Sequence, residues 1–129
     1  MRNPAINLRK SEAQSGAAQD AAARPEDVRR AREALLPVVA YRDLASLFSA
    51  LGDPTRAAMV HVLAHQELCP ADLAITLGLH RPATSQHLRV LKQLRIVRSR
   101  REGRLVLYSL DDAHVADLLS RALEHARED

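Results

Sequence analysis

Four side chains that can bind a metal ion lie close together near the C-terminal end of the sequence: Asp112, His114, His125 and Glu128. Two imidazoles and two carboxylates suit a tetrahedral zinc site, for which cobalt and nickel are competitors. Apolar residues recur around these positions at helical spacing, so we expect one final helix, capped by Asp111 or Asp112, to carry all four.

The length of this helix determines how the four side chains could meet. His114 and His125 are eleven residues apart, which is about three turns and roughly 16 Å of rise, so one helix cannot bring both to the same ion. A two-fold dimer can place Asp112 and His114 of one chain beside His125 and Glu128 of the other, giving two identical sites per dimer. The spacing alone leaves a second interpretation open, in which Asp112 only caps the helix and the other three are solvated side chains.

Residues 81–104 form a basic segment in an otherwise acidic chain. The segment contains eight basic residues and one acidic residue, whereas the rest of the chain has eleven basic and fifteen acidic residues. A local basic patch is typical of a nucleic-acid-binding surface. A charged face that is merely solvated would have the same composition. The helices and strands predicted for this segment are therefore needed to distinguish a nucleic-acid-binding surface from a solvated one.

The basic segment spans a predicted helix, residues 82–94, and two predicted strands, residues 96–101 and 104–110. A short helix over residues 70–77 and the link at Gly78 complete a helix-turn-helix, whose second helix enters the major groove of DNA. Gln can read adenine there and Arg can read guanine, while arginines around the strand turn can bind phosphate at a flanking groove. We therefore expect DNA contacts from Arg81, Thr84, Ser85, Gln86, His87, Arg89, Lys92, Arg98, Arg100, Arg101 and Arg104.

The sequence as a whole predicts a mainly α-helical winged helix-turn-helix with a β-hairpin wing. Its 129 residues are the size of one domain, and aromatic residues make up only 2%, so the core must be aliphatic. We expect residues 1–24 to be a flexible arm and residues 25–129 to form the DNA-binding and dimerisation domain. The apolar stripe predicted for the last helix consists of Val115, Leu118, Leu119, Ala122, Leu123 and Ala126.

Composition also excludes several classes of protein. The single cysteine, Cys69, rules out a disulfide framework and a cysteine-rich metal site. No apolar run approaches the roughly 20 residues that span a bilayer, and the first residues do not form a secretory signal, so we expect a cytoplasmic protein with no membrane partner. There is no nucleophile–base arrangement or glycine-rich phosphate loop, so we do not expect an enzyme.

Four segments in order resemble the ArsR/SmtB family of bacterial winged-helix repressors: SALGDPTRAAMVHVL, LCPADLAITLGL, SQHLRVLKQLRIV and RREGRLVLYSL. The resemblance covers roughly residues 38–128. It implies a homodimer that represses transcription from an inverted-repeat operator and leaves the DNA when an inducer binds. It also implies that Asp112, His114, His125 and Glu128 form the zinc site of the SmtB-like branch. His80 departs from the pattern, because the family usually has a Ser that caps the recognition helix.

Some family members have a second metal site on the helix before the recognition helix, and Cys69 matches one position of it. The chain has no other cysteine and no histidine before His61, so we expect Cys69 to be a semi-buried structural residue. The same count argues against thiolate sensing of arsenic, lead or cadmium. His61 and His65 have an i, i+4 spacing that can bind a metal, but without a third ligand nearby we expect a surface pair.

Three alternatives to a zinc-responsive repressor remain at this point. The first is a relative that responds to nickel or cobalt. The second is a zinc hydrolase, which is disfavoured because four protein ligands leave no open position for a water molecule. The third is a winged-helix protein that binds DNA without any ligand.

Overall fold

The structure, a computed structural model, describes residues 21–128. The chain divides into two compact units, Met1–Ala45 and Ser46–Asp129. The division falls inside a helix, whereas the sequence predicted a boundary after residue 24. Most of the predicted N-terminal arm lies outside the described residues, so that prediction is not tested.

The first unit contains the helix α2 (Pro25–Ala34) and the start of α3 (Val38–Leu51). No residue of α2 is buried, and its side chains pair along the helix surface, with Arg29 between Glu26 and Glu33. Such exposed pairs contribute little to stability individually. Pro37 lies in the short break between the two helices.

None of the described helices is by itself long and apolar enough to cross a membrane. The helices α2 and α3 taken together satisfy length and composition, but they are bent by 71° at the break between them.

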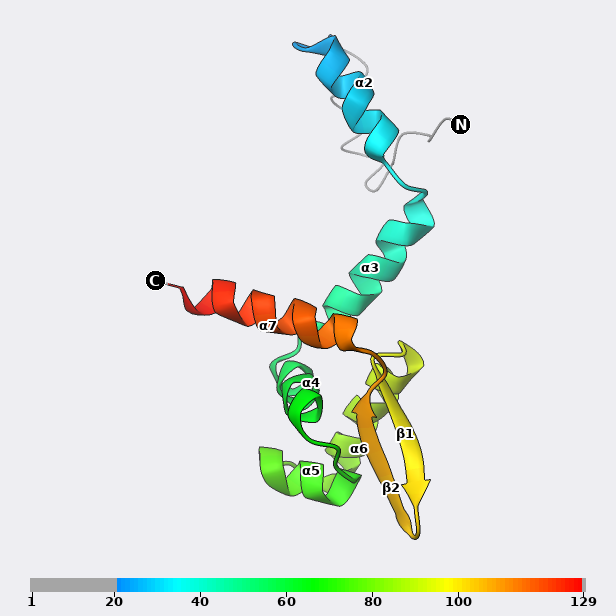
Figure 1. Cartoon of the computed structure of the whole chain (residues 1–129), viewed down its shortest axis with the longest axis vertical. Coiled ribbons are helices and arrows are strands. Elements are labelled where there is room, and N and C mark those ends of the chain that lie inside the picture. Colours follow the sequence, from blue (N-terminus) through cyan, green and yellow to red (C-terminus); the bar gives the residue numbers. More distant parts are fainter. Residues whose placement is uncertain (1–20, 129) are drawn as a thin grey trace. The chain divides into compact units, whose positions relative to one another are not determined.

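The second unit has an aliphatic core built by three helices: α4 (Pro54–His65), α5 (Pro70–Leu77) and α6 (Arg81–Gln93) (Figure 1). The predicted aliphatic character is confirmed, because the buried core contains no aromatic side chain among the described residues. The core residues shared by these helices and their flanks are Ala50, Met59, Val60, Leu63, Leu73, Leu88, Leu91, Ile96 and Val97.

The ends of α4 and α5 are set by local sequence signals. The Asp53 side chain accepts a hydrogen bond from the backbone N–H of Arg56 at 3.0 Å and caps α4, and this bond holds the pKa of the Asp53 carboxyl below its usual value. Gly78 ends α5 in the left-handed conformation, with φ of 67°, which a residue with a Cβ adopts only at a cost. The chain then turns into α6, which begins one residue before the predicted start.

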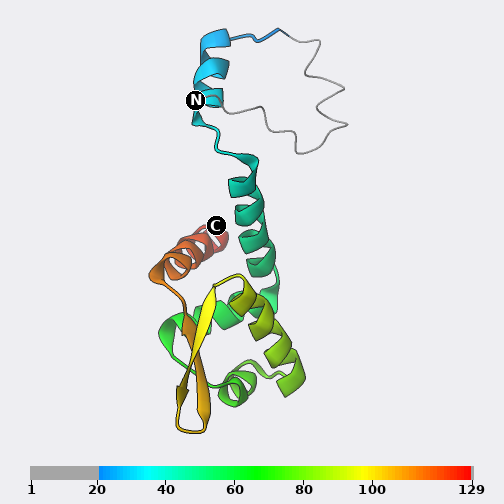
Figure 2. The ribbon, with the colours of Figure 1, turned by 90° about the vertical axis from the view of Figure 1, so that its right-hand side faces the viewer.

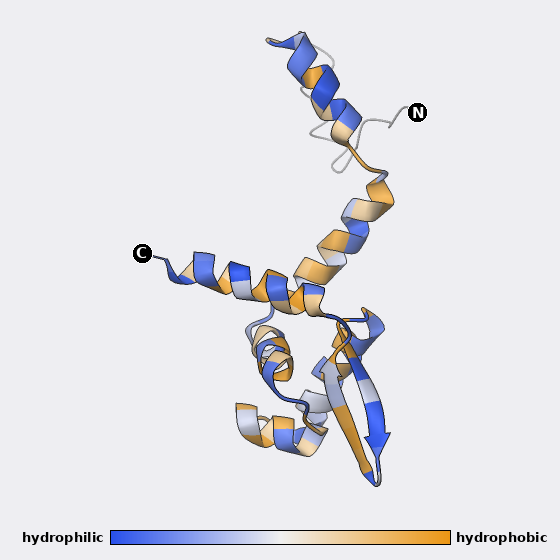
Figure 3. Cartoon of the chain, in the orientation of Figure 1, coloured by the Kyte–Doolittle hydropathy of each residue, from blue (hydrophilic) through white to orange (hydrophobic). Residues whose placement is uncertain are grey.

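The wing is the antiparallel hairpin of β1 (Val97–Glu102) and β2 (Leu105–Leu110), which projects past the helices in both views (Figures 1 and 2). Gly103, with φ of 63°, makes the tight turn that joins the strands. Colouring by hydropathy shows a hydrophilic β1 beside a largely hydrophobic β2 (Figure 3). Tyr108 and Leu110 pack against the core, so this face of β2 is turned inward.

The last helix, α7 (Ala113–Arg127), is capped by Asp112, whose carboxylate accepts a hydrogen bond from the His114 N–H at 2.8 Å. Val115 and Leu119 pack against the core, as predicted. The C-terminal half of the predicted stripe does not, since Leu123 is 36% exposed and its alanine neighbours are exposed too. The helix therefore extends beyond the core of its own chain and leaves an apolar surface uncovered.

Candidate DNA-binding surface and metal site

The recognition helix α6 presents a polar face at its N-terminal half. Arg81, Ser85, Gln86 and Arg89 are exposed and share no hydrogen bond or ion pair with another side chain within residues 21–128. His80 precedes the helix as its N-cap but makes no side-chain cap bond, in agreement with the weaker cap expected from the sequence. These four side chains are free to reach a base edge or a phosphate.

Thr84 is not part of this polar face, which corrects the prediction that it contacts DNA. Its side chain is 0% exposed, and its hydroxyl donates a hydrogen bond to the His80 carbonyl at 3.0 Å. The helical period explains the difference, because Thr84 lies on the same face as Leu88 and Leu91, four and seven residues later. Because its hydroxyl is buried and hydrogen-bonded within the helix, Thr84 cannot contact a base.

His87 is half-buried and contacts the helix α4. The Arg56 guanidinium lies 3.4 Å from the His87 Nδ1 atom, while the Arg56 Nε donates to the Ala50 carbonyl at 2.8 Å. Because arginine can only donate, Nδ1 is the acceptor and the neutral ring carries its proton on Nε2. A contact from His87 to DNA would therefore be donated by Nε2.

Lys92 lies at the end of the recognition helix and contacts the wing. Its ammonium group donates a hydrogen bond to the Ser99 hydroxyl at 2.8 Å and lies 6.0 Å from the centre of the Tyr108 ring. The predicted phosphate contact from Lys92 would have to compete with these interactions.

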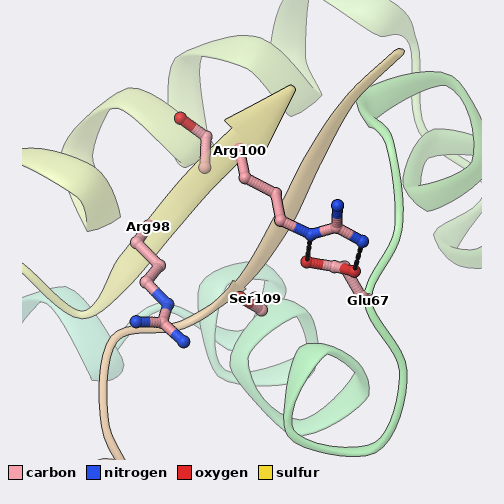
Figure 4. Close-up of a pocket in the computed structure, with 5 residues that line it drawn as sticks. Glu67, Arg98, Arg100 and Ser109 are labelled. Atoms are coloured by element: carbon pink, nitrogen blue, oxygen red, sulfur yellow. Dashed lines mark hydrogen bonds and ion pairs between the residues drawn. The ribbon is translucent and has the colours of Figure 1, made fainter. Parts of the chain in front are cut away.

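The arginines of the wing fall into two groups. Arg98, Arg101 and Arg104 are exposed and pair with no acidic side chain in the described part of the chain. Arg100 is also exposed, but it donates two hydrogen bonds to Glu67, at 2.9 and 2.7 Å (Figure 4). It donates a third hydrogen bond to Glu102 at 2.9 Å.

The bonds from Arg100 alter the ionisation of both partners. The hydrogen bonds from Arg100 lower the pKa of the Glu67 carboxyl. In turn, the hydrogen bond to Glu67, and to a smaller extent the one to Glu102, raise the pKa of Arg100 above its usual value. Arg100 and Glu67 therefore form a charged pair at neutral pH. Sequence reasoning missed Glu67, because no local pattern links residues that are 33 positions apart.

The candidate metal ligands lie at the two ends of α7. At the start, the Asp112 carboxylate is 3.4 Å from the His114 Nδ1 atom, and the His114 side chain is 93% exposed. At the other end, His125 is exposed in the last turn and Glu128 is the C-cap. Within residues 21–128 of one chain, no three His, Cys, Asp or Glu side chains are close enough to hold one metal ion.

The remaining candidate ligands do not form a site in the described part of the chain. On α4, the His65 Nδ1 atom lies 2.9 Å from the His61 carbonyl oxygen, and the two rings are 5.0 Å apart at their centres. Both histidines are exposed, which agrees with the expected surface pair. Cys69 is 5% exposed as the N-cap of α5, where its thiol makes no cap bond.

Comparison with known proteins identifies the family. Residues 53–99 match the family described as bacterial regulatory protein, arsR family. The chain is 40% identical over 103 residues to a transcriptional repressor SmtB homolog of Synechocystis, which covers 80% of this chain and 78% of that one. The chain belongs to the ArsR family of bacterial regulatory proteins. The resemblance seen in the sequence motifs is thereby confirmed.

Two further matches are informative. A cadmium resistance transcriptional regulatory protein CadC homolog of Staphylococcus aureus is 46% identical over 87 residues, covering 67% of this chain and 72% of that one. The solution structure of a homodimeric winged helix-turn-helix DNA-binding domain from Mycobacterium bovis superimposes with a TM-score of 0.65 at 26% identity, covering 69% of this chain and 82% of that one. The winged-helix fold is confirmed, and this ArsR-family chain is a DNA-binding transcriptional regulator rather than an enzyme.

Proposed function

We propose that this ArsR-family protein is a metal-responsive transcriptional repressor, and that zinc is its inducer. In this proposal a homodimer binds an inverted-repeat operator through the exposed face of α6 and the free arginines of the wing. Metal binding at α7 then releases the DNA. As a DNA-binding regulator it would act in the cytoplasm.

The observation that carries the proposal is the placement of the four ligands on α7. Asp112, His114, His125 and Glu128 are all exposed, yet they lie at opposite ends of the helix. Each end offers one imidazole and one carboxylate, so two ends from two chains supply the four N and O donors of a tetrahedral zinc site. Bound zinc would supply a link between the two helices that neither chain can make alone.

A dimer through α7 is supported by the uncovered part of its apolar stripe. Leu123 is exposed within the same stretch of helix that carries His125. A second copy related by a two-fold axis would cover this surface with the identical surface of its partner. The homodimeric state of the Mycobacterium bovis domain supports a homodimer, without specifying its interface.

Release of DNA requires that the two binding events be coupled. The dimer in the DNA-binding state holds its two α6 helices at the spacing of the operator half-sites. The metal shifts the dimer away from that state only to the extent that it binds the other state more tightly. Because α7 follows directly from β2, a change in how two α7 helices pack is transmitted to the wing and to α6 through one continuous chain segment.

The proposal is tested by DNA binding in the presence of metals. A duplex selected by the wild-type protein from a random-sequence pool serves as the probe, and fluorescence anisotropy follows binding as zinc, cobalt or nickel is added. We expect zinc to release the wild-type protein, and the double variant His114→Ala/His125→Ala to bind the same duplex without responding to zinc.

Three outcomes would contradict all or part of this proposal. If zinc released the double variant from the duplex, α7 would not be the sensing site. A wild-type protein that binds the duplex equally well with and without all three metals would be a ligand-independent DNA-binding protein. Stronger release by nickel than by zinc would identify nickel as the inducer.

Gln86→Ala is expected to reduce discrimination between the selected duplex and base-substituted duplexes by about 1–3 kcal/mol per contacted base pair. Gln86 is exposed at the N-terminal half of α6, the part of a recognition helix that contacts bases. Arg101→Ala is the matched comparison, because the loss of a phosphate contact weakens binding to all duplexes similarly. Unchanged sequence preference in Gln86→Ala would show that α6 is oriented differently in the groove.

Cys69→Ser is expected to leave the zinc response within about twofold of the wild-type response. Cys69 is buried and the chain has no second cysteine with which it could bind a metal. Serine is a better N-cap than cysteine, so α5 should not be destabilised. Loss of the response in a folded, dimeric Cys69→Ser protein, or thiolate-to-cobalt absorption in the wild type, would make Cys69 a ligand.

A further inference from the structure

The Arg100–Glu67 pair joins the wing to the helix-turn-helix. Arg100 lies in β1, and its guanidinium presents two parallel N–H groups to the two oxygens of Glu67, an arrangement that fixes orientation as well as distance (Figure 4). Glu67 lies in the short segment between α4 and α5, three residues before α5 begins. The two residues therefore connect the hairpin to the start of the first helix of the motif.

Backbone contacts continue the same junction. Leu68, next to Glu67, exchanges two backbone hydrogen bonds with Tyr108 of β2, at 2.8 and 3.2 Å. On the other face of β1, Ser99 accepts the hydrogen bond from Lys92 of α6. The hairpin is thus hydrogen-bonded to the segment before α5 through Arg100 and Tyr108, and to the end of α6 through Ser99.

The Arg100 guanidinium is already paired with acidic side chains. Its single positive charge faces two carboxylates, Glu67 and Glu102, both within 3 Å. Both carboxylates already accept hydrogen bonds from the Arg100 guanidinium, so Arg100 would have to leave these partners to bind a phosphate. Arg98, Arg101 and Arg104 have no such partners in the described part of the chain.

A shallow cavity of about 340 Å³ beside the pair is lined by Glu67, Arg98, Ser99, Arg100 and Ser109. The Arg100 side chain bends toward Glu67 across the strand (Figure 4). The Arg98 side chain points away from Glu67 in the same view.

We propose that Arg100 is a positioning residue: its pair with Glu67 sets the wing relative to the helix-turn-helix, and Arg100 itself does not contact DNA phosphate. This inference rests on the proposed DNA-binding role of the wing. It separates the wing arginines into one that orients the hairpin and three that are available to bind phosphate.

The test uses the full-length variants Glu67→Gln, Arg100→Gln and the double variant, with the duplex selected by the wild-type protein as probe. We expect each single variant to weaken binding by about threefold to tenfold, and the double variant to be no weaker than the single ones, because the two residues act as one unit. The slope of log affinity against log salt should stay at the wild-type value in all three, since no phosphate contact is lost.

Glu102→Gln is the matched control, because it removes the same charge from the Arg100 cluster but keeps the two bonds to Glu67. We expect its affinity to stay within about twofold of wild type. Amide hydrogen exchange gives a readout without DNA: exchange at Leu68 and Tyr108 should become faster in Glu67→Gln and Arg100→Gln, and not in Glu102→Gln.

Changes in DNA affinity in the opposite direction would overturn the inference. If Arg100 binds phosphate, Glu67→Gln frees it and tightens DNA binding, and Arg100→Gln lowers the salt slope by about two per dimer. An equal loss in Glu102→Gln, or unchanged exchange at Leu68 and Tyr108, would also exclude a specific role for Glu67. A wild-type protein that selects no duplex would instead refute the proposed function, while the exchange measurement would still decide whether the pair holds the wing.

Discussion

Raising the salt concentration from 50 to 200 mM should weaken DNA binding by this protein about 10⁴-fold. If about four basic residues per protomer meet phosphate, a dimer neutralises roughly eight phosphates, and log affinity falls with log salt with a slope near −7. The structure provides enough exposed arginines for this number: Arg81, Arg89, Arg98, Arg101 and Arg104 pair with no acidic side chain within residues 21–128.

Single substitutions check which side chains produce this slope. Arg101→Ala should lower its magnitude by about one per protomer, because one phosphate contact is lost in each half-site. Arg121→Ala is the control, since Arg121 is equally exposed but lies on α7, outside the basic segment. A wild-type slope near zero would remove residues 81–104 from the DNA interface.

Much of the fold could be predicted because its helix ends are set locally. Asp53 and Pro54 start α4, and Gly78 ends α5 as the sequence predicted. The hairpin turn falls at Gly103-Arg104, one residue later than the predicted strands placed it. Each of these signals acts within one turn of the chain, so it can be read without knowing the tertiary structure. The last helix shows the limit of this reasoning, since periodicity predicts an apolar stripe but not how much of the stripe the chain's own core covers.

The DNA-binding surface was predictable in outline but not residue by residue. The helical period of α6 is sufficient to place Thr84 beside Leu88 on the buried face, whereas the hydroxyl chemistry of Thr84 alone suggests a DNA contact. The pairing of Arg100 with Glu67 could not have been found in the same way. It depends on how the segment before α5 packs against β1, which is a tertiary contact without a sequence period.

The residues of the candidate metal site could be predicted from their types and spacing. The described residues of one chain do not bring these four side chains together. The start of α7 holds Asp112 and His114 side by side, which agrees with the local part of the pattern. Their proposed partners, His125 and Glu128, are about three turns away on the same helix, so the site depends on the symmetry of a dimer. This dependence makes subunit exchange the sharpest test of the arrangement.

A mixed dimer of His114→Ala and His125→Ala chains should regain one tight zinc site. In the proposed arrangement each site takes Asp112 and His114 from one chain and His125 and Glu128 from the other. The mixed dimer then has one site that lacks both histidines and one site that keeps both. Either variant homodimer has two damaged sites, each with a single histidine.

Zinc titration of the separate and mixed variants distinguishes the possible geometries. We expect the homodimers to bind zinc weakly and the mixture, after subunit exchange, to bind one ion per heterodimer with wild-type affinity. Zinc should also tighten the wild-type dimer, because only the dimer presents complete sites and metal that binds one state stabilises it by mass action. A site built within one chain would leave every site in the mixture damaged. Tight binding that fails to return, although exchange is confirmed by labelled subunits, would therefore rule out the shared site and leave the histidines of α7 without a common ion.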